Sequence, residues 1–157
     1  PVPRQRPEAV KRFKPALGLK GAADRGRGIF LTRCAACHIA ERTSQAPGPE
    51  LVSAKIYGKE KALAAILEPN VDVRRDYLTY VVETMEGMVL IGLLRNENAV
   101  AITVQQPNGA AVVLPRANIR YGQAQPWSLM PEGIEEGLTP QDMADLLGYI
   151  LRLIATP

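Results

Sequence analysis

One short motif constrains the fold and chemistry of this chain more than any other: residues 34–38 read Cys34-Ala-Ala-Cys37-His38. This is the spacing at which haem is attached covalently through two thioethers. Thiols three residues apart lie on one side of a helical turn, where both can add to the vinyl groups of one porphyrin. The motif therefore predicts one covalent haem c, with Cys34 and Cys37 as attachment points and His38 as an iron ligand.

Two other uses of the motif are a redox dithiol and part of a zinc site. His38 is the only histidine and the two motif thiols are the only cysteines, so the four ligands of a structural zinc are not available from these residues. A thioredoxin-like dithiol follows a buried strand, whereas Asp24–Arg33 reads as a helix. The haem interpretation is favoured over both.

The second axial ligand of a six-coordinate iron has to come from another residue type, and methionine is the usual one. Of the four methionines, Met143 lies on the apolar stripe of an expected helix, and Met85 and Met88 flank an expected hairpin turn. Met130 lies in a loop, and Pro131 restricts its backbone to an extended conformation. We therefore predict Met130 as the distal ligand.

The C-terminal segment has the clearest helix signals. Thr139 is a good N-cap, Pro140 suits the first helical position, and Asp142 complements the positive helix end. One apolar stripe follows at helical spacing: Met143, Leu146, Leu147, Ile150, Leu151 and Ile154. In the expected helix before the motif, Gly26 predicts close backbone approach by this terminal helix, near Gly148 and Tyr149.

The middle of the chain favours strands. Turn residues separate four apolar, β-branched runs, Tyr77–Met85, Met88–Arg95, Ala99–Gln105 and Ala110–Leu114. We expect an inserted antiparallel β-meander at about residues 77–115, preceded by a short helix over Glu60–Leu67.

These features together resemble a class I c-type cytochrome. The resemblance rests on Gly26, Phe30, the 34–38 motif, Gly48-Pro49-Glu-Leu51, Met130 and Asp145–Ile150. It implies a mainly α fold with crossed N- and C-terminal helices around the haem, α+β overall once the meander is included. It also implies that the carbonyl of Pro49 accepts a hydrogen bond from the His38 imidazole. We expect Phe30 and Trp127 to pack beside the macrocycle.

A narrower resemblance, over about Gly21–Ile154, is to a haem-binding domain described in Pirellula- and Verrucomicrobium-type bacteria. Its carrying segments include Ala64–Asn70, Tyr80–Gly87 and Ser128–Pro131. Such domains often end large membrane-bound dehydrogenase-like proteins. This implies a redox partner protein or a parent dehydrogenase, and a periplasmic or otherwise extracytoplasmic location.

Charge is concentrated at the N-terminus. Residues 1–33 hold nine Lys or Arg against two Asp or Glu, and the remaining residues hold ten against fourteen. We interpret residues 1–20 as a basic linker or short helix and residues 21–157 as the haem domain. No aromatic interleaving or motif indicates nucleic-acid binding, and no apolar run is long enough for a membrane span.

Two functions fit these residues. The first is electron transfer without bond-making, so that the chain is not itself an enzyme, with His38 and Met130 holding iron in both oxidation states. The alternative is a sensor or catalyst for carbon monoxide, nitric oxide or peroxide, with an open or labile distal position. The sequence favours the first because it offers Met130 and no distal histidine. Glu132, Glu135 and Glu136 are expected to form a solvated acidic rim beyond the ligand.

Overall fold

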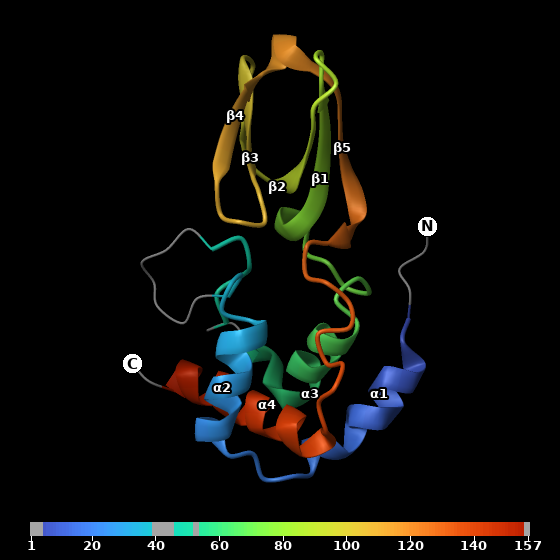
Figure 1. Cartoon of the computed structure of the whole chain (residues 1–157), viewed down its shortest axis with the longest axis vertical. Helices are drawn as coiled ribbons and strands as arrows, with labels where there is room; N and C mark the ends of the chain where they lie inside the picture. Colours follow the sequence, from blue (N-terminus) through green and yellow to red (C-terminus); the bar gives the residue numbers. More distant parts are fainter. Residues whose placement is uncertain (1–4, 39–45, 52–53, 156–157) are drawn as a thin grey trace.

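A computed structural model describes residues 5–38, 46–51 and 54–155 of the chain. Helices gather at one end of the molecule and a sheet stands at the other (Figure 1). The elements are α1 (Pro7–Phe13), η1 (Lys14–Leu17), α2 (Ala23–Arg33), α3 (Ala54–Leu67), η3 (Arg75–Tyr77), β1 (Leu78–Thr84), β2 (Val89–Glu97), β3 (Ala101–Gln105), β4 (Ala111–Pro115), η4 (Arg116–Asn118), β5 (Ile119–Ser128) and α4 (Pro140–Ala155). The α+β class expected from the sequence is confirmed.

The backbones of helices α2 and α4 are in direct contact, which Gly26 in α2 makes possible. A Cβ on Gly26 would lie 1.9 Å from the carbonyl oxygen of Asp145, and one on Gly21 would lie 2.1 Å from that of Ala144. The predicted close approach is therefore present. The contact on Gly26 falls one turn before the expected Gly148, which faces Gly21 instead.

Asp145 fixes the same crossing from within α4. Its carboxylate, 1 % exposed, accepts hydrogen bonds from the backbone N–H of Ala22 at 2.7 Å, from Arg25 at 2.7 and 3.2 Å, and from the amide of Gln141 at 3.0 Å. Burial raises the pKa of this carboxyl, but the donors together outweigh burial and leave the pKa below its ordinary value. Asp145 therefore ties the start of α2 to α4 as a charged group.

The start of α4 is fixed as the sequence predicts. Thr139 and Asp142 form a capping box, in which the Asp142 N–H donates to Thr139 Oγ1 at 3.1 Å and the Thr139 N–H donates to Asp142 Oδ2 at 2.8 Å. The first four residues of the predicted stripe enter the core, where Met143 and Leu147 are fully buried. The side chain of Ile154 lies outside the described residues. Capping thus sets the register in which α4 meets α2.

The sheet contains the four predicted strands and a fifth. All pairings are antiparallel in the order β4-β3-β2-β1-β5, so β5 returns past three strands to pair with β1. The predicted meander over 77–115 is thus incomplete, because the sheet runs to Ser128. Most residues of β5 are exposed, and its sequence, Ile119-Arg-Tyr-Gly-Gln-Ala-Gln-Pro-Trp-Ser128, lacks the apolar alternation that marks a half-buried strand.

The sheet has its own apolar core, separate from that of the helices. It consists of Val82, Leu90, Ile102, Val104 and Leu114. The turn between β1 and β2 lies at the end of the sheet remote from the helices, as Figure 1 shows. Residues in that turn are therefore distant from the helical core.

The N-terminal segment packs on the helical core. α1 ends at Phe13, and Phe13 and Ala16 are both fully buried in one cluster with residues of α2, α3 and α4. The described part of residues 1–20 therefore shares a core with the rest of the helical end.

α3 extends beyond the predicted Glu60–Leu67, and Gly58, at φ 76°, interrupts it just before Lys59.

Gly26→Ala should destabilise the fold, because the new methyl group would force α2 and α4 apart. We expect the free energy of unfolding of the holoprotein to fall by about 1–3 kcal/mol in guanidinium titrations. Gly28→Ala is the matched control two residues away, where an added Cβ meets nothing within 4 Å; it should gain up to about 1 kcal/mol from helix propensity. Equal effects of the two substitutions would contradict the close contact.

Candidate haem site

The two cysteines stand at the end of α2 on a continuous set of turns. The Cys34 N–H donates to the carbonyl of Phe30 at 2.8 Å, and the N–H groups of Cys37 and His38 donate to the carbonyl of Cys34 at 3.1 and 2.8 Å. Neither cysteine is in a disulfide. The end of α2 therefore leads directly into the turns that carry both thiols and the imidazole.

The Cys34 thiol is not in a setting that favours redox exchange. Its residue is 9 % exposed, and burial raises its pKa to about 11. A thiol with that pKa is almost wholly protonated at neutral pH, whereas redox-active and metal-binding cysteines act as thiolates. The site therefore fits a thiol destined for a buried thioether better than a reactive dithiol.

His38 is buried and oriented by a carbonyl. Its Nδ1 lies 3.0 Å from the carbonyl oxygen of Pro49, so the predicted contact is confirmed. A carbonyl only accepts, so Nδ1 carries the proton and Nε2 keeps its lone pair for a metal. Burial lowers the pKa of His38, and the Pro49 bond opposes this only in part, so the ring favours its neutral, metal-binding form.

A tight loop holds Pro49 in place against the ring. The Gly48 N–H donates to the carbonyl of Cys37 at 2.9 Å, and a Cβ on Gly48 would lie 2.8 Å from His38 ring atoms. From the sheet, Arg95 donates to the carbonyl of Pro47 at 3.1 Å. Glycine is thus required where the backbone passes the imidazole, and the base of the sheet supports this loop.

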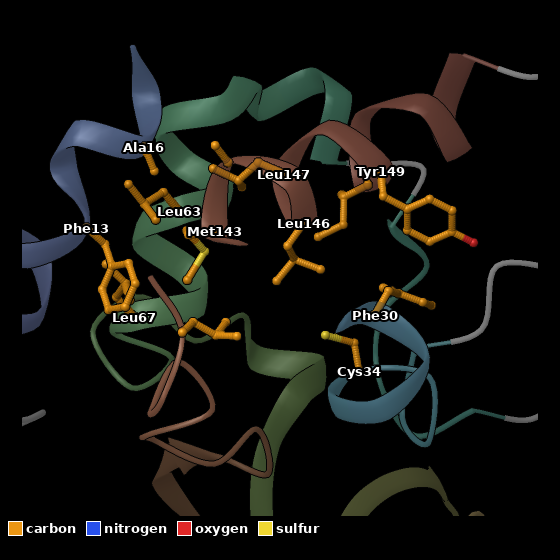
Figure 2. Close-up of a cluster of buried hydrophobic side chains, with 13 residues drawn as sticks. Phe13, Ala16, Phe30, Cys34, Leu63, Leu67, Met143, Leu146, Leu147 and Tyr149 are labelled. Atoms are coloured by element: carbon orange, nitrogen blue, oxygen red, sulfur yellow. The ribbon is translucent and has the colours of Figure 1, made fainter. Parts of the chain in front are cut away.

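An aromatic pair lies one turn before Cys34. Phe30 is 1 % exposed, and its ring centroid lies 5.3 Å from that of Tyr149 on α4 at an interplanar angle of 56°. Figure 2 shows Phe30 and Cys34 on one side of α2, near Leu146, with Met143 farther along beside Leu63. Contact of Phe30 with a porphyrin remains a prediction.

The four methionines lie in different places. Met143 is fully buried in the helical core with Phe13 and Leu67. Met85 and Met88 are 53 % and 54 % exposed at the β1–β2 turn, remote from the helices (Figure 1). Met130 is half-buried in the loop that joins β5 to α4. Its N–H donates to Ser128 Oγ at 3.0 Å.

Trp127 and Glu135 were also assigned surroundings from the sequence. Trp127 lies on β5, 37 % exposed and outside both protein cores, so its contact with the macrocycle stays a prediction. Glu135 is 4 % exposed and paired with Arg6, which contradicts the expected solvated rim at that position. No local pattern in the sequence indicates this pair, because Arg6 and Glu135 are 129 residues apart.

A family model described as Cytochrome c matches residues 23–153. The chain belongs to the cytochrome c family. Membership implies covalently bound haem c with iron, and haem-based electron transfer. The site geometry agrees with this assignment, since the neutral His38 and both thiols lie within one turn. Comparison of this cytochrome c chain with curated proteins gives no significant match.

Some residues that shape this cytochrome site were missed by the sequence analysis. Gly48 was noted as part of a motif, but only the structure shows its backbone against the imidazole. Arg95 and Arg33 reach loop carbonyls 48 and more than 100 residues away. Sequence spacing has no signal for such contacts, because they depend on how the sheet and helices are placed.

Gly48→Ala should disturb the proximal imidazole, because the new methyl group would overlap the ring. Loss of the Pro49 hydrogen bond makes the imidazole a weaker donor, so we expect the reduction potential of the holoprotein to rise and the ferric electron paramagnetic resonance spectrum to change. Gly28→Ala is again the control. A mutant with the wild-type potential and spectrum would show that the loop does not orient the ring.

Proposed function

We propose that this chain is a monohaem electron-transfer domain in which His38 and Met130 are the axial ligands of the iron. We further propose that it serves an extracytoplasmic dehydrogenase as a domain or subunit. The single observation that carries the proposal is the buried His38 ring, which directly follows Cys37, with Nδ1 directed at Pro49 and Nε2 left for iron.

The count of haem groups follows from the motif. The sequence has one histidine and two cysteines, and all three lie within residues 34–38. A second haem c attached in the same way would need another pair of thiols and another imidazole. This supports one covalent haem.

The surroundings of the methionines support Met130 as the distal ligand. Met143 already packs in the protein core, and Met85 and Met88 stand on a turn remote from α2. Met130 has neither constraint, since it is half-buried in a loop that leads directly into α4, the helix packed on α2. A loop also allows the thioether more freedom of placement than a helix face does.

When bound, haem supplies reversible one-electron redox chemistry. The protein's part is to keep the same ligands in both oxidation states. The Pro49 carbonyl holds the imidazole in one orientation, and the Ser128 hydroxyl fixes the backbone at Met130. A methionine and histidine pair raises the reduction potential relative to two imidazoles. These features suit an electron relay.

The partner and the location are proposed from the narrower resemblance. The segments shared with the Pirellula and Verrucomicrobium type of domain include Ala64–Asn70 and Ser128–Pro131. Domains of that type are found with membrane-bound dehydrogenase-like proteins, which makes a periplasmic dehydrogenase the proposed electron donor. Across the described ranges, none of the helices combines the length and apolar character that crossing a bilayer requires.

Met130→Ala tests the axial pair. The ferric wild-type holoprotein should show a far-red sulfur-to-iron absorption band, and the mutant should lose it completely. The mutant should also have a lower reduction potential, because the thioether ligand is gone.

Met85→Ala and Met88→Ala are the controls, and both should keep the band because their side chains lie on the remote turn. A band that persists in Met130→Ala would assign the ligand elsewhere. A wild-type ferrous protein that binds carbon monoxide rapidly, with no far-red band in its ferric form, would instead support the small-ligand sensor or catalyst.

A further inference from the structure

The loop that carries Met130, residues 129–139, is held by side chains from several other parts of the chain. Arg33, next to Cys34, donates to the carbonyls of Ile134 and Glu136 at 2.7 and 2.8 Å. Asn70 donates to Glu132 at 2.8 Å and accepts from the N–H of Ser128 at 2.9 Å. The loop is therefore held on the side of α2 and on the side of α3.

A third attachment comes from the N-terminal segment, which precedes the region matched by the cytochrome c family model. Arg6 donates through Nη2 to Glu135 Oε1 at 2.5 Å and through Nη1 to the carbonyl of Leu67 at 2.8 Å. Its backbone N–H donates to Glu68 at 2.7 Å. Arg6 thus joins the Met130 loop to the end of α3.

A second arginine of the N-terminal segment, which lies on α1, extends this attachment. Arg12 donates to the carbonyl of Leu138 at 3.0 Å, and Phe13 beside it is fully buried in the helical core. α1 therefore lies against the loop from Glu135 to Leu138 while it is anchored to the core. Movement of α1 and movement of the loop are mechanically linked through these contacts.

Burial makes the Arg6 and Glu135 pair costly to break, because either charge left alone would be poorly solvated. The Glu135 side chain is 4 % exposed and that of Arg6 is 21 % exposed. Glu135 Oε2 is buried without a hydrogen-bond partner among the described residues. Removing Arg6 would leave a buried carboxylate without this cation, which is costly unless the loop moves to hydrate it.

We propose that Arg6 and Glu135 are a positioning pair through which the N-terminal segment holds the Met130 loop closed over the iron. This rests on the proposed ligand role of Met130. The pair acts through the loop, by raising the free energy of the loop conformation in which Met130 has left the iron. The N-terminal segment, which we call the strap, thus holds the loop of the distal ligand in place and is not only a connector.

The test is competition for the distal position. In ferric holoprotein, added imidazole displaces a methionine ligand, so its apparent dissociation constant measures how firmly the loop is held. Arg6→Ala should bind imidazole about tenfold more tightly than wild type or better, with earlier loss of the far-red band. Lys11→Ala is the matched control, since it removes one positive charge from an exposed site on α1 and should leave the constant unchanged.

Further variants separate positioning from general stability. Glu135→Gln should also tighten imidazole binding, and the double variant with Arg6→Ala should show less than the sum of the two effects. Arg6→Lys should restore part of the wild-type behaviour. A purely structural role would lower the guanidinium midpoint of Arg6→Ala but leave imidazole affinity equal to that of Lys11→Ala, and this result would overturn the inference.

The outcome also distinguishes the two proposals. If wild type has no far-red band, or Met130→Ala leaves it intact, the ligand assignment itself is wrong. If the band depends on Met130 but Arg6→Ala and Glu135→Gln bind imidazole like the control, the ligand assignment stands and the strap does not.

Discussion

The contact on which the site depends is the backbone approach of α2 to α4. Gly26 allows the carbonyl of Asp145 to lie where any side chain would stand, and the Asp145 carboxylate binds the Ala22 N–H at the start of α2. Because α2 ends at the two cysteines, this contact fixes where the thiols and His38 emerge. It also fixes α4, to which the Met130 loop is joined. The positions of both proposed iron ligands therefore depend on how α2 and α4 pack against each other.

Hydrogen bonds from distant parts of the chain hold both sides of the proposed haem site. On the proximal side, His38 is oriented by the Pro49 carbonyl, in a loop kept close by Gly48 and supported by Arg95 from the sheet. On the distal side, the loop after Met130 is attached by arginines from the N-terminal segment and from α2. The sheet has its own core, but its base contributes to both sides through Arg95 and Ser128. This gives the inserted strands a supporting role at the site beyond their own packing.

Local signals in the sequence were sufficient to predict much of the fold and of the proximal side of the site. The motif predicted the thiols and imidazole together, Thr139 and Asp142 predicted the start of α4, and turn residues separated four of five strands. β5 was missed because its side chains are mostly exposed and carry no alternation. Glu135 was misplaced for a different reason: its burial depends on Arg6, which no local pattern connects to it. Likewise, Gly26 predicted a close approach but not which turn of α4 it would meet. For Glu135 and Gly26 the missing information was a long-range contact, since periodicity and capping report only on neighbours along the chain.

Covalent attachment of one porphyrin through Cys34 and Cys37 underlies every role assigned to the site. It can be measured as the mass of the intact protein, matured in a host that attaches haem and then denatured. We expect the polypeptide mass plus that of one haem, and loss of the added mass when both cysteines are replaced by alanine. A wild-type protein of bare polypeptide mass would rule out covalent haem attachment.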